Sequence, residues 1–270
     1  MANKEEIFSR LWEDYTTQNP SAKKIYDLFT DKGETVVNDH IAFRTFNHPK
    51  IGIDVLSRIF LKAGYQYIQD YHFEAKKLYA KHFEHKEDKD APRIFISELR
   101  LELCSKFLQI AVQGMVNKID HSNLKSDRMV FSGNIWGNPS FDMYNKLREE
   151  SEYAAWLYVY GFRANHFTVS VNHLKTYDTV EKVNSFLKEN GFLINDSGGE
   201  IKGTPAELLE QSSIKADHIM VEFKDGRHEI PGCYYEFAKR YPDKDGRLYS
   251  GFIAKSADKI FESTDYYDKK

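Results

Sequence analysis

Apolar and polar positions along the chain follow two periods, one typical of strands and the other of helices. Alternation with a period of two predicts strands at 36–46, 93–99, 106–112, 165–174, 218–223 and 233–241. Apolar residues at helical spacing predict helices at 4–30 (two segments divided at Pro20), 50–64, 138–160, 178–191 and from Thr204 onward. The charged stretch 81–91 is expected to form a loop, and the polar tail after about residue 255 to lie over the surface. The mixture predicts an α+β protein.

A strand-helix pattern occurs twice, with its copies about 126 residues apart. His40 precedes Gly64 by 24 residues and His166 precedes Gly191 by 25, and a predicted helix ends at each glycine. The apolar run "IFISEL" begins 54 residues after the first histidine, and "IMVEF" begins 53 after the second. Units of this length are too long for short solenoid repeats, so we expect two sheet-and-helix modules around a shared centre. One catalytic domain is expected over residues 1–270, with a first module at about 34–115, a helical spacer at about 138–160 and a second module at about 161–241.

The matched strands are each predicted to have one polar and one apolar face, because side chains alternate across a strand. His40 and Arg44 share a face of the first strand. In the equivalent strand of the second module, His166 shares a face with two hydroxyl side chains, and in the last strand Glu236 points away from its aromatic neighbours. If the apolar faces pack on helices, the polar faces point into a common concavity.

His40, His166 and Glu236 therefore form a candidate metal site. Two neutral imidazoles and one carboxylate on one side of a cation leave up to three positions open, which suits iron(II) acting with molecular oxygen. The alternative for each histidine is a structural role in the core. Glu98 and Glu222 compete with Glu236, but they occupy similar places in the two modules, which is typical of shared scaffold.

Four further polar residues are candidates for a substrate pocket. Gln109 follows the first histidine by 69 residues, much as the candidate glutamate follows the second by 70, so we expect it at the equivalent position. There its amide would hydrogen bond to a ligand residue or to the substrate. Thr168 and Ser170 share the face of the second histidine and line the pocket unless that face is solvated. Arg163, just before this strand, is placed to help hold a carboxylate.

The composition is that of an ordinary soluble chain and excludes several classes of function. The 270 residues are 41% hydrophobic and 29% charged, with a net charge of -3 and no basic stripe, so nucleic acid is not an expected partner. No apolar run approaches the roughly 18 residues of a membrane span. Two cysteines are too few for a disulfide framework, which favours a reducing cytoplasm. The sequence does not define the oligomeric state.

Three segments resemble the 2-oxoadipate dioxygenase/decarboxylase family: "NDHIAFRTF", "SEYAAWLYVYGFRANHFTVSVN" and "GCYYEFAKRYP". The resemblance runs from about residue 30 to 265. It implies a vicinal oxygen chelate-like half-open barrel, in which duplicated modules surround one metal. Position by position, it implies His40, His166 and Glu236 as metal ligands and Arg44 as the arginine that binds the substrate. The chain is shorter than the bacterial members, so it resembles a compact form of the family.

The resemblance also implies an activity. Family members convert 2-oxoadipate and molecular oxygen to 2-hydroxyglutarate and carbon dioxide, so an Fe(II)-dependent dioxygenase acting on this or a related 2-oxo diacid is expected, although another divalent metal could be present after purification. Arg44 suits a diacid because its planar guanidinium binds a carboxylate in two places; pairing with a surface acid is the alternative. The rival functions are a glyoxalase-type isomerase or hydrolase that uses zinc or nickel, and a non-catalytic binding or regulatory protein.

Overall fold

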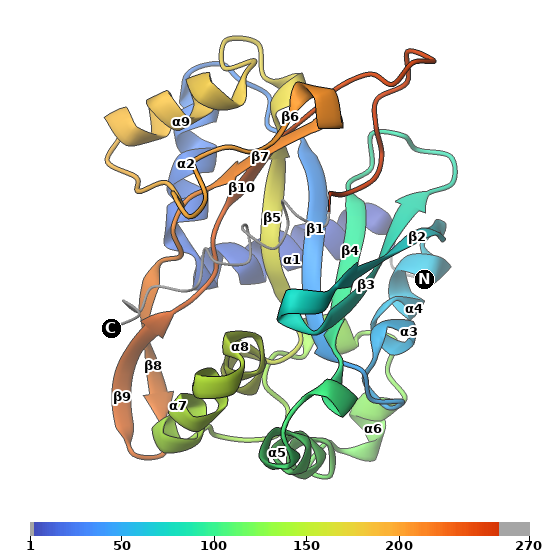
Figure 1. Ribbon diagram of the computed structural model, residues 1–270, viewed down its shortest axis with the longest axis vertical. Coiled ribbons are helices and arrows are strands. Elements are labelled where there is room, and N and C mark those ends of the chain that lie inside the picture. Colours follow the sequence, from blue (N-terminus) through green and yellow to red (C-terminus); the bar gives the residue numbers. More distant parts are fainter. Residues whose placement is uncertain (1–2, 254–270) are drawn as a thin grey trace.

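The computed structural model describes residues 3–253 and is built around one large sheet (Figure 1). Its eight strands follow the order β2-β3-β4-β1-β5-β10-β7-β6. The first half consists of β1 (Asn38–Phe46), β2 (Tyr65–Phe73), β3 (Leu78–His85) and β4 (Arg93–Leu99). The second half consists of β5 (Ala164–Ser170), β6 (Lys202–Thr204), β7 (Leu209–Ser213) and β10 (Glu236–Arg240). The polar tail expected after residue 255 lies outside the described residues.

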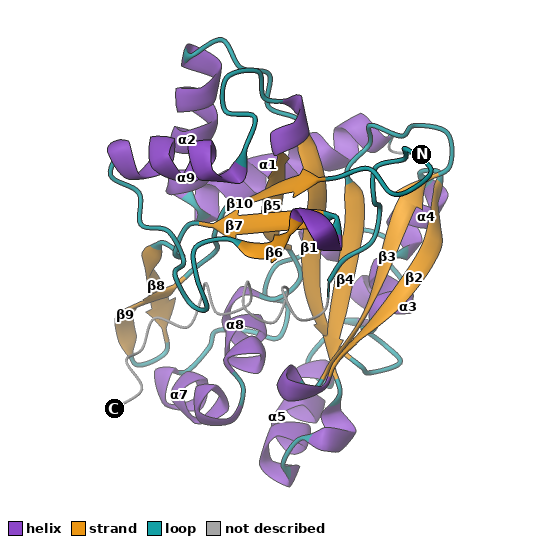
Figure 2. Ribbon diagram, turned by 45° about the horizontal axis from the view of Figure 1, so that its top comes forward, coloured by secondary structure: helices purple, strands orange, loops and turns teal. Residues whose placement is uncertain are grey.

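The strand order repeats from the centre of the sheet outward. β1 and β5 pair antiparallel at the centre. β4 runs parallel to β1, and β10 runs parallel to β5. Antiparallel strands complete each half, β3 and β2 on one side and β7 and β6 on the other. The sheet curls into a half-open barrel (Figure 2), so the predicted α+β half-barrel of two repeated modules is confirmed.

A two-stranded hairpin, β8 (His218–Phe223) and β9 (Gly226–Pro231), stands apart from the large sheet. It is inserted between β7 and β10, so the predicted equivalence of 93–99 with 218–223 is wrong, and the counterpart of β4 is β10. The parallel pairs give the correct match. Ala42, two residues after the first histidine, lies opposite Phe95. Thr168, two residues after the second histidine, lies opposite Glu236. Phe95 therefore occupies in the first module the position that Glu236 occupies in the second.

Helices pack against the convex face of the sheet. They are α1 (Lys4–Gln18), α2 (Pro20–Asp31), α3 (Ile53–Leu56), α4 (Arg58–Lys62) and α9 (Val180–Glu189). The ring of Trp12 in α1 lies 5.1 Å from that of Phe167 in β5. The ring of Phe60 in α4 lies 5.3 Å from that of Phe43 in β1. Because these outward side chains are buried by helices, the alternate side chains of the same strands point into the concavity.

The remaining helices gather at one end of the barrel, in the lower part of Figure 1. They are α5 (Lys106–Val116), α6 (His121–Leu124), α7 (Phe141–Glu150) and α8 (Glu152–Tyr160). The helical spacer predicted at 138–160 corresponds to α7 and α8. The indole of Trp156 in α8 donates to the carbonyl of Gly232 at 3.0 Å, so α8 is joined to the segment that leads into β10. Within the described residues, every helix is too short or too polar to cross a bilayer.

Residues 106–112, predicted as a strand, belong to α5. Ser105 caps this helix by accepting from the backbone N–H of Leu108 at 3.2 Å. Leu108, Val112 and Met115 are buried at spacings of four and three residues, which is the helical period. A short apolar run fits either period, and here its continuation beyond residue 112 decides for a helix.

Three other expected elements also differ from the structure. Residues 50–64 form the two short helices α3 and α4 instead of one helix. The loop expected at 81–91 begins inside β3, which continues to His85. The helix expected from Thr204 is a single 3₁₀ turn that leads directly into β7. In the last two cases, pairing within the sheet overrides the local sequence preference.

We predict that Gly161→Ala strongly destabilises the protein. Gly161 joins α8 to β5 with φ 65° and ψ −144°, a conformation that only glycine adopts readily. An added Cβ would overlap the backbone of Gly133, which bridges to Phe162. The free energy of unfolding, measured by urea denaturation, should fall by about 2–4 kcal/mol. Gly191 also has a positive φ but open space around an added Cβ, so Gly191→Ala should cost only about 1 kcal/mol. Equal losses would contradict the steric account.

Candidate metal centre

His40, His166 and Glu236 meet at the centre of the concave face. They come from the adjacent strands β1 and β5 and from the start of β10. One donor atom from each residue lies within 4.8 Å of the others, and the three side chains are 3%, 3% and 1% exposed. Nε2 of His40 is 3.6 Å from Oε1 of Glu236, and Nε2 of His166 is 3.2 Å from Oε2. The sheet therefore brings together three residues that lie far apart in the sequence.

Each histidine is held by the residue immediately before it. Nδ1 of His40 lies 2.8 Å from a carboxylate oxygen of Asp39, and Nδ1 of His166 lies 3.0 Å from the amide oxygen of Asn165. Each oxygen can only accept, so Nδ1 of each ring carries the proton and Nε2 carries the lone pair. Both lone pairs are thus available on the atoms that approach the carboxylate of Glu236.

The histidines are neutral near pH 7. Burial lowers the pKa of His40, and the neighbouring Asp39 only partly opposes this effect. Burial lowers the pKa of His166 well below its usual value, with His40 and Arg44 acting in the same direction. Neutral imidazole is the form that binds a metal, so no proton has to leave either ring.

Glu236 is the ligand candidate whose charge depends on its surroundings. Burial raises its pKa to about 8, although a hydrogen bond from Gln211 favours the charged form. The side-chain amide of Gln211 in β7 donates to Oε1 of Glu236 at 2.5 Å. Without a cation the buried carboxyl group therefore holds its proton at neutral pH, and a bound cation would compensate its charge.

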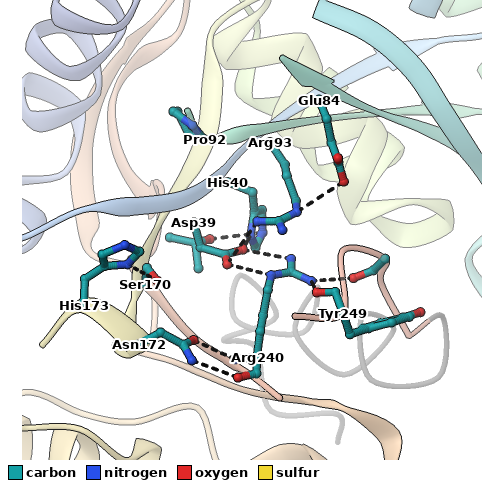
Figure 3. Close-up of polar contacts among 12 residues, drawn as sticks. Asp39, His40, Glu84, Pro92, Arg93, Ser170, Asn172, His173, Arg240 and Tyr249 are labelled. Atoms are coloured by element: carbon teal, nitrogen blue, oxygen red, sulfur yellow. Dashed lines mark hydrogen bonds and ion pairs between the residues drawn. The ribbon is translucent and has the colours of Figure 1, made fainter. Parts of the chain in front are cut away.

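Asp39 lies between two arginines and remains ionised (Figure 3). Nε and Nη2 of Arg240 donate to its two oxygens at 2.7 and 2.9 Å, and Nη1 of Arg93 lies 3.6 Å away. Burial acts to raise the pKa of Asp39, but Arg240, the hydrogen bond with His40 and Arg93 together hold it well below its usual value. The carboxylate that orients His40 is thus fixed by a bidentate ion pair.

A divalent cation fits the three donor atoms. Ligand atoms about 2.1 Å from one ion and at right angles to each other lie about 3 Å apart. The separations of 3.6 and 3.2 Å between the imidazole nitrogens and the carboxylate are close to this value. The donor set, two neutral nitrogens and one carboxylate, is also one that binds first-row divalent metals.

Arg44 faces the centre from the end closed by α8. It is 2% exposed, and its guanidinium carbon lies 5.0 Å from the ring centre of Tyr153 and 5.2 Å from that of Trp156. Its charge also contributes to the lowered pKa of His166. The two aromatic rings of α8 therefore support a buried cation beside the three ligand candidates.

Thr168 and Ser170 lie on the same face of β5 but have different neighbours. The hydroxyl of Thr168 is 3.1 Å from Nε2 of His40, so it belongs to the group at the centre. The hydroxyl of Ser170 is 2.8 Å from Nδ1 of His173. Ser170 lines a separate pocket of about 80 Å³ beside the Asp39 carboxylate. Their roles toward a substrate stay predictions.

Gln109 and Arg163 are not part of this group. Gln109 lies on α5, where its amide donates to the carbonyl of Cys104 at 2.8 Å, so its predicted equivalence with Glu236 is wrong. The similar residue counts after the two histidines led to this error, because they matched a position on helix α5 with a position on strand β10. Nη1 of Arg163 lies 3.5 Å from Asp14 in α1, and its Nε donates to a backbone carbonyl, so the guanidinium is directed to the helix and not to the centre.

The two competing glutamates lie elsewhere. Glu98 in β4 accepts from the backbone N–H of Ile53 at 3.1 Å. Glu222 lies on the exposed hairpin strand β8, 3.7 Å from Arg227. They are not equivalent positions of a repeat, because β8 belongs to the insertion.

Several residues around the centre were not among the candidates from sequence. Asp39 and Asn165 each precede a histidine, and this shared feature of the repeat could have revealed them. Gln211 was hidden because its strand was read as a helix. Phe252 had no signal at all, since it comes from a distant segment; its ring lies 4.8 Å from that of His40 and covers it.

The model of the 2-oxoadipate dioxygenase/decarboxylase family matches residues 7–132 and 128–249. The chain belongs to this family. A curated relative from rice (Oryza sativa subsp. japonica), named 2-oxoadipate dioxygenase/decarboxylase, chloroplastic/amyloplastic, is 36% identical over 282 residues. The alignment covers 96% of this chain and 78% of the relative. Membership of the 2-oxoadipate dioxygenase/decarboxylase family agrees with the resemblance seen in the sequence.

Solved structures are similar to this family member over nearly its whole length. The hydroxyglutarate synthase of Oryza sativa in complex with 2-oxoadipate is 34% identical, with a TM-score of 0.90 and coverage of 96% of this chain and 91% of that one. A Shewanella frigidimarina protein, named provisionally as a hydrolase, is 48% identical, with a TM-score of 0.87 and coverage of 93% and 97%. A glyoxalase-superfamily protein from Ralstonia eutropha, 22% identical with a TM-score of 0.74 and coverage of 90% and 83%, shares the fold.

Metal binding by this family member should release about one proton at pH 7. Glu236 has a pKa of about 8 and is largely protonated there, whereas the bound form must be ionised. Calorimetric metal titrations in two buffers of different ionisation enthalpy measure the release, which should fall to about a tenth of a proton at pH 9. Glu98→Gln, which removes a partly buried glutamate that also has a raised pKa, should leave the release unchanged. Equal release at both pH values would contradict the assignment.

Proposed function

We propose that this chain is an iron(II)-dependent dioxygenase that converts 2-oxoadipate, or a related 2-oxo diacid, and molecular oxygen to 2-hydroxyglutarate and carbon dioxide. The observation that carries the proposal is the buried group of two imidazoles and one carboxylate, whose donor atoms lie within 4.8 Å of one another. Such a ligand set with open positions is typical of iron enzymes that use oxygen. Family membership supports the same activity, since the rice synthase was crystallised with 2-oxoadipate.

His40, His166 and Glu236 would hold the iron. When bound, iron(II) supplies Lewis acidity and the electrons that activate oxygen. Asp39 and Asn165 keep the two imidazole rings in the tautomer that presents Nε2 to the ion. The nearly complete burial of the three ligands keeps bulk water from the reacting atoms.

Arg44 would bind the distal carboxylate of the diacid. It lies four residues after His40 on the same face of β1, so the two Cα atoms are about 13 Å apart at roughly 3.3 Å per residue. Both side chains reach into the concavity, which shortens the span to one that a six-carbon diacid can bridge. The guanidinium is restrained by the rings of Tyr153 and Trp156, so its fork is preorganised for a carboxylate.

Both modules contribute to this centre. The first histidine and Arg44 come from one module, and the second histidine and Glu236 come from the other. We therefore propose that the two modules act as one catalytic domain. The cytoplasmic location expected from the cysteines remains part of the proposal, and it is supported by Cys104 and Cys233, which are both buried and free.

Oxygen uptake separates this function from its rivals. Protein loaded anaerobically with iron(II) should consume oxygen when 2-oxoadipate is added and should release one carbon dioxide per oxygen molecule, measured with an oxygen electrode and carbon dioxide trapping. Glu236→Gln should abolish both, because a neutral amide is a poor ligand for the ion. An isomerase or hydrolase would transform a substrate without oxygen, and a binding protein would transform none, so either result would overturn the proposal.

We predict that Arg44→Lys impairs turnover of a diacid while iron binding stays within about twofold of the original. Hydrogen bonds to charged groups contribute about 1.5–3 kcal/mol, and lysine cannot form the bidentate pair, so kcat/KM for 2-oxoadipate should fall roughly 10- to 100-fold. The matched control is 2-oxohexanoate, which lacks the distal carboxylate and should show little change. Steady-state kinetics measures turnover, and an anaerobic iron titration measures iron affinity. Equal losses in the two quantities would count against this role of Arg44.

A further inference from the structure

Tyr234 has a fully buried side chain whose hydroxyl lacks a hydrogen-bond partner among the described residues. Two other buried tyrosines, Tyr71 and Tyr153, do have partners. The hydroxyl of Tyr71 is 2.8 Å from Nδ1 of His82, and that of Tyr153 donates to the carbonyl of Ser97 at 2.7 Å. A buried hydroxyl without a partner is unfavourable unless a ligand supplies one. The hydroxyl of Tyr234 is therefore available to a bound molecule.

Tyr234 lies against the candidate metal centre. It comes two residues before Glu236, on the same side of the chain, and its ring stacks on that of His166 with centroids 4.7 Å apart and planes at 28°. The charges of Glu236 and Arg44 both act on its phenol, which places the side chain near the ligand group and near the arginine proposed to bind the distal carboxylate. The substrate of the proposed reaction would occupy the space that joins these two groups.

Tyr235 provides the contrast. Its hydroxyl is also buried and lacks a partner in the described part of the chain. Its ring, however, points to the convex side, where it lies 5.8 Å from the ring of Trp12 and 6.3 Å from that of Tyr15 in α1. Two consecutive tyrosines thus have the same unpaired group on opposite faces, and only one of them faces the candidate centre.

We propose that the hydroxyl of Tyr234 donates a hydrogen bond to an oxygen atom of the bound 2-oxo diacid and thereby orients it beside the three metal ligands. This inference rests on the proposed function. A 2-oxo diacid brings carboxylate and keto oxygens, each of which can accept a hydrogen bond from a phenol. Burial and the charge of Glu236 keep the pKa of Tyr234 well above its usual value, so the phenol retains the proton it donates. Tyr234 would be a substrate-binding residue and not a metal ligand.

The test compares Tyr234→Phe with the control Tyr235→Phe. Both variants remove one unpaired hydroxyl and keep the ring, so neither should lower thermal stability. Binding of 2-oxoadipate to iron(II)-loaded protein is measured by calorimetry without oxygen, and iron affinity is measured in the same preparations. Tyr234→Phe should raise the Kd for 2-oxoadipate roughly tenfold with iron affinity within about twofold, because one hydrogen bond to a charged acceptor is lost. Tyr235→Phe should change neither.

Each other outcome overturns the inference in a recognisable way. If Tyr234→Phe binds 2-oxoadipate as tightly as the original protein, the hydrogen bond does not exist, while the proposed function stands. If both variants weaken binding equally, the effect comes from packing around β10 and not from a contact with the substrate. If the original protein itself neither binds nor turns over 2-oxoadipate, the proposed function fails and this inference fails with it.

Discussion

The antiparallel pairing of β1 with β5 is the interaction on which the rest of the structure depends. It joins the two modules into one sheet, and its register sets His40 opposite Thr168 and Ala42 opposite His166. β10 then joins in parallel and brings Glu236 opposite Thr168. A slip of one residue would turn a strand's side chains to the wrong face, so the burial of Phe167 against α1 also fixes the direction of His166. Packing on the convex face thus positions the polar groups on the concave face.

The two histidines are held by different neighbours, and the difference concerns charge. Asp39 gives His40 an ionised partner, which makes that imidazole the more basic ligand candidate, whereas the neutral amide of Asn165 does not. A buried carboxylate is costly unless it is paired, and Arg240 meets this need. The same guanidinium donates to the carbonyls of residues 249 and 251 at 2.9 and 2.7 Å, close to Phe252, the residue that covers His40. One buried cation therefore links the orientation of His40 to the segment above it.

Side-chain alternation, together with the repeat and the family resemblance, identified the three ligand candidates, because a strand with one polar and one apolar face shows which side chains share a concavity. Counting residues between the modules was not enough. The predicted position of Gln109 was wrong because "KFLQIAV" fits both periods, and only the capping Ser105 and the helical continuation distinguish a helix from a strand here. The predicted equivalence of 93–99 with 218–223 was wrong for another reason. The hairpin β8–β9 is an insertion, and an insertion shifts every later residue count between the modules. Contacts such as Gln211 with Glu236 depend on strand neighbours that a single sequence does not order.

Phe95 places an aromatic ring where the second half of the barrel has the carboxylate of Glu236, so the two halves are unequal. A phenyl group has no lone pair to offer a cation. The candidate set therefore takes one donor from the first half and two from the second. Neither half holds all three residues, so the candidate centre exists only where the two halves meet.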